Sequence, residues 1–320
     1  MRARCYVETW PLRTSFVISR GARTSAQVVV VELTAAGRSG VGECTPYPRY
    51  GESVQSVLAQ LESVLPEVEA GLDREQLQAL MPAGAARNAL DCALADWESS
   101  AVTSPATGRR CTGPRSLNTV QTLVIDTPER MSRAAEAAVA DGVRVLKLKL
   151  DDRQVLERVM AVRRAAPEAQ LVIDANEAWS PGNLVERCQS LAQLGVAMLE
   201  QPLPAGEDEF LASFSHPLPI CADESCHTRG DLSRLRGRYE MINIKLDKTG
   251  GITEALALAE AGQAAGFALM LGCMLCTSRA IRAAWPLGEK VRFRDLDGPT
   301  WLARDVVPPL RFAGGRVYWD

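Results

Sequence analysis

Short apolar runs recur along the last two-thirds of the chain, and a stretch with apolar positions at helical spacing follows each run. The expected strands are residues 119–125, 143–150, 171–174, 197–200, 219–222, 241–246, 267–273 and 291–297. Strands that alternate with helices favour a parallel sheet. Eight such units make a TIM barrel of about 250 residues. The pattern therefore predicts an α/β fold with a barrel of parallel strands over residues 117–298.

The first 98 residues follow a different pattern. Residues 4–10 and 27–33 have strand-like composition, and the second run is nearly all β-branched. Residues 53–70 and 85–98 carry apolar side chains at helical spacing. Strands followed by helices predict a separate α+β module over residues 1–98.

Two further segments join or close these parts. Residues 99–116 are rich in Ser, Thr, Gly and Pro, which is typical of a linker. Residues 310–319 predict a terminal strand. We expect the tail from about 299 to 320 to return to the N-terminal module, so that the predicted domains are residues 1–98 with this tail, and residues 117–298.

Composition limits the classes of function. The chain has 320 residues, a formal net charge of −3 and nine scattered cysteines. It lacks the clustered basic face of a nucleic-acid-binding protein. The N-terminus lacks the apolar stretch of a secretory signal, and the most apolar segment, residues 267–277, is shorter than the about 20 residues that cross a bilayer. We expect a cytoplasmic protein that binds neither nucleic acid nor membrane; the oligomeric state stays open.

Charged residues end several of the predicted strands, although parallel barrel strands are buried on both faces. Lys149, Asp174, Glu200, Asp223 and Lys245 follow one another at intervals of 25, 26, 23 and 22 residues. Catalytic groups of a TIM barrel lie at the C-terminal ends of its strands. The regular spacing therefore predicts that these side chains meet in one pocket.

The three acids predict a metal site. Asp174, Glu200 and Asp223 end successive strands, and neighbouring strands are about 4.8 Å apart. Carboxylates that close repel one another unless they are protonated or bind a cation. An all-oxygen set favours Mg²⁺, with Mn²⁺ as an alternative, over zinc. One acid alone would also suit a helix cap, but three in register with lysines favour the metal.

The lysines predict acid/base chemistry. Lys147 and Lys149 are two residues apart on one strand, so both face the barrel axis. Lys245 comes from a strand across the ring. A lysine beside a dication and a second lysine has a lowered pKa, so Lys149 can take a proton from one face of a carbon and Lys245 can return one to the other. Lys248 fits an exposed lysine at a strand end better.

Five short motifs together resemble the muconate lactonizing subgroup of the enolase superfamily. They are the K-x-K pair at Lys147, D-x-N at Asp174, E-Q-P at Glu200, D-E-S at Asp223 and K-L-D-K-T-G-G at Lys245. The resemblance covers nearly the whole chain. It implies an α+β capping domain, built from the N-terminal part and the C-terminal tail, on a (β/α)7β TIM-like barrel.

The resemblance also implies a role for each site residue. The metal ligands would be Asp174, Glu200 and Asp223. The catalytic residues would be Lys149 and Lys245, with Lys147 adding electrostatic stabilisation. Asn176 and Glu224 would orient the ligands and lysines.

Asp295 and Asp297 narrow the resemblance to the dipeptide epimerases. They lie two residues apart in R-D-L-D-G-P, so both can face the pocket. The D-x-D pair of that family binds the N-terminal amine of a dipeptide. Residues 42–53, 82–94 and 271–281 also look like the L-Ala-D/L-Glu epimerases of enteric bacteria. A solvated turn is the alternative for this acid pair.

Two N-terminal loops complete the site that the resemblance implies. An early loop with Arg20 and Arg23 would cover the pocket, where an arginine suits a glutamate carboxylate. The sequence leaves open which arginine binds it. Tyr50 and Glu52 lie in a second loop that we expect to close over the site.

We therefore expect metal-dependent epimerisation of L-Ala-D-Glu and L-Ala-L-Glu by two-base proton transfer through an enediolate, in the recycling of murein peptides. An N-acylamino-acid racemase or an o-succinylbenzoate synthase is the alternative within the subgroup, and neither substrate offers an ammonium to the D-x-D pair. A non-catalytic, metal-dependent carboxylate binder is the alternative from another class.

Overall fold

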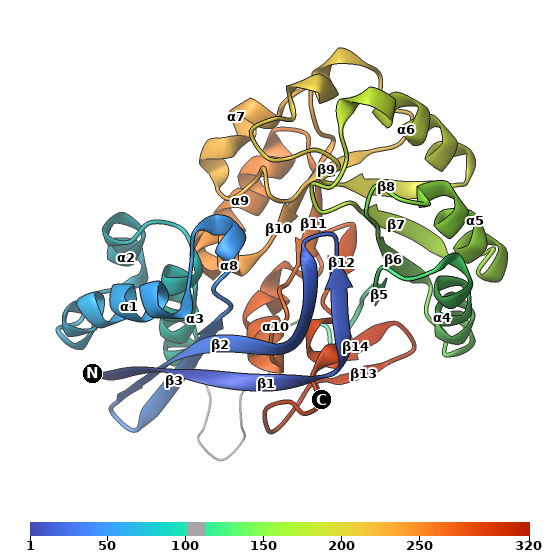
Figure 1. Cartoon of the computed structure of the whole chain (residues 1–320). Coiled ribbons are helices and arrows are strands. Elements are labelled where there is room, and N and C mark those ends of the chain that lie inside the picture. The colour runs from blue at the N-terminus through green and yellow to red at the C-terminus, as the bar shows by residue number, and fades with distance from the viewer. Residues whose placement is uncertain (101–112) are drawn as a thin grey trace.

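The computed structural model describes residues 1–100 and 113–320 (Figure 1). The strands are β1 (Arg2–Ile18), β2 (Gly21–Ala35), β3 (Arg38–Cys44), β4 (Ser116–Asn118), β5 (Gln121–Leu123), β6 (Val145–Lys149), β7 (Gln170–Asp174), β8 (Val196–Glu200), β9 (Ile220–Ala222), β10 (Met241–Ile244), β11 (Ala268–Gly272), β12 (Phe293–Asp295), β13 (Arg311–Ala313) and β14 (Arg316–Tyr318). The α-helices are α1 (Val54–Glu69), α2 (Arg74–Leu80), α3 (Ala85–Ser99), α4 (Pro128–Ala140), α5 (Val155–Ala165), α6 (Leu184–Gln193), α7 (Leu232–Leu235), α8 (Leu246–Thr249), α9 (Ile252–Ala264) and α10 (Ser278–Ala284).

Strands β5 to β12 form one parallel sheet in chain order, which confirms the predicted barrel. The sheet curls until its two edges meet, because Val120 N donates to Arg294 O over 2.8 Å. Helices α4, α5, α6 and α9 lie outside the strands (Figure 1). Between β8 and β9 the connection holds the 3-10 helix η3 (Glu209–Ser213) in place of an α-helix.

Apolar side chains fill the barrel below the charged strand ends. The inner cluster contains Val120, Val172, Met198, Cys221, Met241, Met270 and Phe293. Val172, Met198 and Cys221 each lie two residues before a predicted metal ligand, and side chains two apart on a strand share a face. The packed interior thus ends where the charged residues begin.

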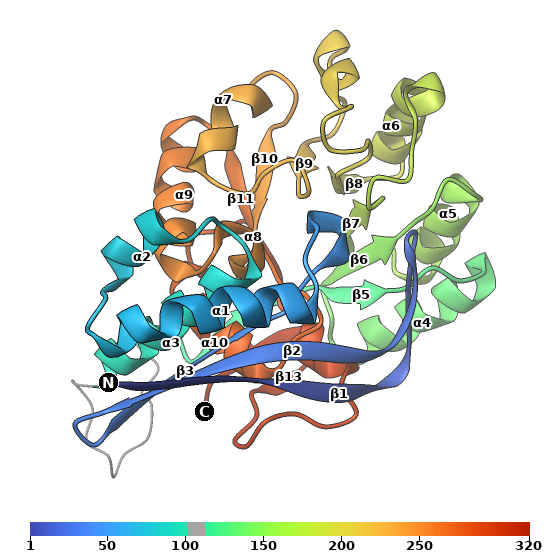
Figure 2. The same cartoon turned by 60° about the vertical axis from the view of Figure 1, so that its left-hand side comes forward.

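The N-terminal module is an antiparallel sheet, β1–β2–β3, covered by α1 and α3, with α2 against α3. Strands β1 and β2 form one long hairpin that extends from this module towards the open end of the barrel (Figure 2). The strand predicted at 4–10 is therefore too short, because β1 continues to Ile18, where Phe16, Val17 and Ile18 pair with β2 after a register shift that begins at Pro11. Helix α2 was not expected, since only Leu77 among its residues is buried.

Local signals explain where two helices begin. Ser53 caps α1, since its Oγ accepts from Ser56 N over 3.0 Å while Ser56 Oγ accepts from Ser53 N. Thr127 caps α4 with Pro128 at its first turn, as expected. In the described part of the chain, no helix combines the length and apolarity needed to cross a membrane.

The C-terminal strands do not join the N-terminal sheet. Strands β13 and β14 form a hairpin, and β14 pairs with β4 just ahead of the barrel. The preceding segment does contact the module, because Ala303 N donates to Pro11 O over 2.8 Å. The domain boundaries remain predictions, and most of the expected linker, residues 101–112, lies outside the described residues.

Candidate active site

Charged side chains gather at the C-terminal ends of the barrel strands. The register pairs Lys149 with Asp174 and Asp174 with Glu200, so these residues are neighbours at the edge of the sheet. Asp223 and Lys245 follow directly after β9 and β10. Parallel strands end at the same edge of the barrel, which is why residues so far apart in the sequence lie together.

Lys147 is wholly buried among three carboxylates. Its Nζ is 2.6 Å from Asp295 Oδ2, 2.7 Å from Glu200 Oε2 and 3.1 Å from Asp174 Oδ2. Burial lowers the pKa of the ammonium, but the three carboxylates outweigh burial and raise that pKa well above its ordinary value. Lys147 is therefore a fixed positive charge at the base of the site.

Lys149 and Lys245 line the same cavity from strands that three others separate in the ring. Lys149 Nζ donates to Asp174 Oδ2, and Lys245 Nζ donates to Asp223 Oδ2, both over 2.5 Å. Burial lowers the pKa of the Lys245 ammonium, but the Asp223 carboxylate outweighs it and the net pKa is raised. The lowered lysine pKa expected from the sequence assumes a dication beside the lysine. In this structure the neighbour of Lys245 is the Asp223 carboxylate.

Lys248 is fully buried, so the expectation of an exposed lysine is wrong. Its Nζ donates to Asp223 O over 2.5 Å and to Asn243 O over 2.8 Å, and it lies 2.7 Å from Asp223 Oδ1. The short helix α8 begins directly after Lys245 and turns Lys248 back under the strand ends. A strand continuing past Lys245, as expected from the sequence, would have placed it at the surface.

The donor set fits a hard divalent cation. Asp174, Glu200 and Asp223 are fully buried and offer only oxygen. Glu200 Oε2 and Asp223 Oδ1 accept no hydrogen bond, although a lysine Nζ lies 2.7 Å from each. Among the described residues no three acids, histidines or cysteines form a ready-made metal cage. Lysine ammonium groups balance these carboxylates in this structure.

The pKa values of Asp174 and Glu200 shift in opposite directions. The pKa of Asp174 is lowered, since Lys149 and Lys147 outweigh the effect of burial. The pKa of Glu200 is raised to about 7, mainly by burial and then by Asp174. Neighbouring carboxylates that are all buried cannot all carry charge without cations between them.

Neighbouring polar groups orient these acids. Asn176 N donates to Asp174 Oδ1 over 2.8 Å, so the backbone of Asn176 holds this carboxylate while its own Oδ1 is buried without a hydrogen bond. Asn243 Nδ2 donates to Glu200 Oε1 over 2.6 Å. Sequence reasoning missed Asn243, although its place two residues before Lys245 was a signal that both share the inner face.

Asp295 and Asp297 both line the cavity at the end of the last strand. Asp295 contacts Lys147, whereas Asp297 Oδ2 accepts from Thr122 N over 2.7 Å. Burial, followed by the charge of Asp295, raises the pKa of Asp297 to about 7. The pair is thus a buried cavity wall and not the solvated turn that was the alternative.

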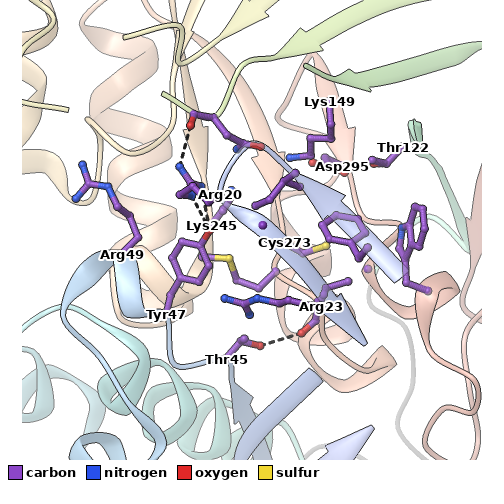
Figure 3. Close-up of a pocket in the computed structure, with 18 of the residues that line it drawn as sticks. Arg20, Arg23, Thr45, Tyr47, Arg49, Thr122, Lys149, Lys245, Cys273 and Asp295 are labelled. Carbon is purple, nitrogen blue, oxygen red and sulfur yellow. Dashed lines mark hydrogen bonds between the residues drawn. The ribbon is translucent and has the colours of Figure 1, made fainter. Parts of the chain in front are cut away.

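The hairpin of β1 and β2 brings Arg20 and Arg23 to the cavity, but their partners differ. Arg20 donates to Glu224 Oε1 over 2.7 Å, to Tyr47 OH over 2.9 Å and to Asn176 O over 3.0 Å. Arg23 lies over the ring of Tyr47, with its guanidinium carbon 5.2 Å from the ring centre. In the close-up of Figure 3, Arg20, Tyr47 and Arg49 lie on one side, and Lys149, Asp295 and Thr122 on the other.

Glu224 and the second loop close the remaining side of the cavity. Burial and the charge of Asp223 raise the pKa of Glu224, whose Oε2 is buried without a hydrogen bond. Tyr50 lines the cavity and lies edge-to-face against His227, with ring centroids 4.5 Å apart. Glu52 does not point into the cavity but fixes the loop, since it accepts from Tyr47 N and Ala85 N.

These residues enclose a cavity of about 520 Å³. Its apolar lining comes mainly from the hairpin and the loop after β11, and includes Phe16, Ile18, Met274, Leu275 and Trp301. Its charged lining holds two lysines, two aspartates, one glutamate and three arginines, namely Lys149, Lys245, Asp295, Asp297, Glu224, Arg20, Arg23 and Arg49. The arrangement suits a small zwitterionic molecule with carboxylates, held between two lysines.

Two protein families match the two parts of the chain. Residues 1–107 match the mandelate racemase / muconate lactonizing enzyme N-terminal domain, and residues 130–319 match the family described as enolase C-terminal domain-like. The chain is 58% identical over 318 residues to the L-Ala-D/L-Glu epimerase of Escherichia coli (strain K12), with 98% of each chain covered. It is 40% identical over 294 residues to the N-acetyl-D-glutamate racemase of a Pseudoalteromonas species, covering 91% of this chain and 92% of the relative.

A solved structure agrees in fold along nearly the whole chain. An enolase family member from Agrobacterium tumefaciens with homology to dipeptide epimerases, crystallised with sodium and L-Ala-L-Glu, has a TM-score of 0.93 and 44% identity, covering 99% of this chain and 97% of its own. A dipeptide epimerase from Enterococcus faecalis, complexed with Mg and L-Leu-L-Tyr, has a TM-score of 0.88 and 28% identity, covering 100% and 96%. The chain therefore belongs to the enolase superfamily, as a member of its mandelate racemase / muconate lactonizing enzyme family.

Proposed function

We propose that the protein is a metal-dependent dipeptide epimerase that interconverts L-Ala-D-Glu and L-Ala-L-Glu. The observation that carries the proposal is one cavity with Lys149 and Lys245 on strands across the barrel and an acid pair, Asp295 and Asp297, at its wall. The similarity to the Escherichia coli enzyme supports the same substrate.

Asp174, Glu200 and Asp223 would hold Mg²⁺, and Mn²⁺ has similar ligand preferences. When bound, the cation supplies positive charge that stabilises the negative charge developing on the substrate carboxylate. Complexes of relatives with Mg or sodium support a cation there.

The two lysines would exchange the α-proton of the C-terminal residue. Lys149 acts on one face of that carbon and Lys245 on the other, so one lysine starts neutral and the other starts protonated. For the reverse reaction, the lysine that was neutral must start protonated and the lysine that was protonated must start neutral. Lys147, with its raised pKa, keeps its proton and contributes only charge. Asn176 and Glu224 contact Asp174 and Arg20, and so orient the groups around the substrate.

Charge complementarity would orient the dipeptide. The α-ammonium group fits beside Asp295 and Asp297, and the glutamate side-chain carboxylate fits an arginine of the hairpin. Arg20 is engaged by Glu224 and Asn176, so we assign this carboxylate to Arg23. Such a dipeptide arises from murein, and we place the enzyme in the recycling of murein peptides in the cytoplasm.

Racemisation of an N-acylated glutamate is the second candidate, because a relative with 40% identity is an N-acetyl-D-glutamate racemase. That substrate needs the same two lysines but has no ammonium for Asp295 and Asp297. The acid pair therefore favours the dipeptide.

Proton NMR in D₂O with Mg²⁺ tests the proposal with both substrates. We expect L-Ala-D-Glu to lose its glutamate α-proton signal and to yield the L,L diastereomer, at a kcat/KM well above that for N-acetyl-D-glutamate. A preference for N-acetyl-D-glutamate would establish the second candidate instead. A protein that exchanges neither α-proton would be a carboxylate binder without catalysis.

A further inference from the structure

The glutamine of the E-Q-P motif has a strained backbone. Gln201 directly follows Glu200, is fully buried and has φ 35°, in the left-handed region that residues with a side chain disfavour. Asn176 and Glu177, at the end of the neighbouring strand, also have positive φ, and Glu177 N donates to Gln201 O over 2.9 Å. Strain of this kind persists only where the surroundings hold the backbone in place.

The side chain of Gln201 fastens the end of β8 to the segment after β9. Its Oε1 accepts from Asp223 N over 2.9 Å and from Ser225 N over 3.1 Å. Its Nε2 faces Leu203 O at 2.8 Å, Ser225 Oγ at 2.9 Å and Tyr239 OH at 3.0 Å. Because the two backbone N–H groups can only donate, the amide oxygen must face them, which fixes the orientation of the amide.

A rigid polar cluster stands behind this amide. Asp208 is fully buried, and its Oδ2 accepts from Ser225 Oγ and Tyr239 OH, each over 2.6 Å. Arg238 Nη1 donates to Asp208 Oδ1 over 2.8 Å. The hydroxyl groups that the amide contacts are therefore themselves held in place.

The backbone ladder between the two strands does not extend to Asp223. Strand β9 ends at Ala222, and its register with β8 pairs only Leu199 with Ile220 and Glu200 with Cys221. The amide of Gln201 takes the place of the next ladder bond, since it binds the N–H of Asp223 itself. It thereby links the residue after Glu200 to the backbone of Asp223.

We propose that Gln201 is a positioning residue that sets the spacing between the carboxylates of Glu200 and Asp223, and through it the affinity of the site for a divalent cation. This inference rests on the metal site of the proposed function. Residues that orient metal ligands typically change metal affinity about 10- to 100-fold when they are replaced.

Three variants of the full chain test the inference. Gln201→Glu keeps the size and the accepting oxygen but loses the donor to Leu203 O. Gln201→Gly tolerates the left-handed backbone and loses the side chain. Leu184→Ala, in a buried position of α6, destabilises the barrel without touching the polar cluster. For each variant, the Kd of Mn²⁺ is measured by electron paramagnetic resonance, and the free energy of unfolding is measured in urea with a chelator.

We expect both Gln201 variants to raise the Kd of Mn²⁺ about 10- to 100-fold, and Leu184→Ala to leave that Kd near the wild-type value at a comparable loss of stability. Kd values within about threefold of wild type for both Gln201 variants would overturn the inference. So would an equal loss of affinity in Leu184→Ala, because stability alone would then explain the effect.

The same titrations separate this inference from the proposed function. A wild-type protein that binds no Mn²⁺ overturns the metal site and the inference together. A protein whose Mn²⁺ affinity depends on Gln201, but which leaves L-Ala-D-Glu unchanged, supports the inference and overturns only the proposed substrate.

Discussion

At the scale of single residues, Asp295 and Asp297 at the end of the last barrel strand make different contacts. Asp295 contacts Lys147, so a change at Asp295 also alters the charge balance at the base of the site. Asp297 accepts from the backbone of Thr122 and lies in the wall of the cavity. A substitution at Asp297 therefore tests the binding of the substrate ammonium more cleanly.

Asp297→Asn removes one negative charge and keeps the side-chain shape. We expect the kcat/KM for L-Ala-D-Glu to fall about 10- to 100-fold, because a hydrogen bond between charged groups contributes about 1.5–3 kcal/mol. Exchange of the N-acetyl-D-glutamate α-proton should change much less. A comparable loss with both substrates would contradict the assignment of the ammonium to this residue.

The two arginines of the hairpin make a matched pair of variants. In Arg23→Gln, the KM for L-Ala-D-Glu should rise about 10- to 100-fold, while the KM for L-Ala-D-Ala, which lacks the side-chain carboxylate, should stay unchanged. In Arg20→Gln, activity towards both dipeptides should fall, because Arg20 holds Glu224 and Asn176. If Arg23→Gln still prefers L-Ala-D-Glu over L-Ala-D-Ala, the glutamate side-chain carboxylate binds another residue.

The positions of residues could be predicted where strand register alone decides them; their roles stay predictions. Asp174 and Glu200 could be placed together because parallel strands end at one edge. Lys248 could not, since its burial depends on a four-residue helix too short for a periodic signal. The partners of Arg20 could not be predicted either, because they lie in loops whose conformation the sequence does not specify.

At the scale of elements, the cavity is closed by two segments of the N-terminal module. The β1–β2 hairpin carries both arginines, and the loop before α1 carries Tyr50. The existence of both segments followed from the resemblance, but the length of the hairpin did not. Beyond Pro11 the pairing of β1 with β2 is interrupted, and it resumes at Phe16 in a shifted register that the sequence pattern does not reveal.

His227, which packs against Tyr50, makes the stability of the folded protein depend on pH. Burial, followed by the charge of Lys248, lowers the pKa of His227 to about 4, whereas the unfolded chain has a histidine pKa of about 6.5. As pH falls from 6.5 to 4 the unfolded state binds the proton first, so stability is lost in that window.

His227→Phe keeps an aromatic ring against Tyr50 and removes the titration. Between pH 6.5 and 4, we expect the free energy of unfolding to fall by about 2 kcal/mol more in the wild type than in this variant. Urea denaturation at several pH values measures it. Parallel pH profiles for the two proteins would show that His227 is not buried as a neutral ring.

At the scale of the whole molecule, buried polar contacts join the N-terminal module to the barrel. Asp247 of α8 accepts from Thr45 N and from Asn88 Nδ2, each over 2.9 Å. Glu43 of β3 accepts from Thr277 N over 2.7 Å, just before α10. These contacts fix the module against the end of the barrel that holds the site. The sequence could predict two parts, but not the side chains that join them.

Metal binding should stabilise the molecule as a whole. A ligand at a hundredfold excess over its Kd adds about 2.7 kcal/mol to the free energy of unfolding, so the Tm should rise with Mg²⁺ concentration and fall back with a chelator. Differential scanning fluorimetry measures the shift. Glu200→Gln should abolish most of it, and an equal shift in that variant would place the ion at another site.

The central claim is that two lysines act on opposite faces of one carbon. The most direct test follows the glutamate α-proton of L-Ala-L-Glu and of L-Ala-D-Glu, separately, by NMR in D₂O with Lys149→Ala and Lys245→Ala. We predict that both variants lose epimerisation by at least about 10³-fold, and that each still exchanges the α-proton of only one diastereomer, a different one for each variant. Near-wild-type epimerisation by either variant, or exchange of the same diastereomer by both, would contradict the account.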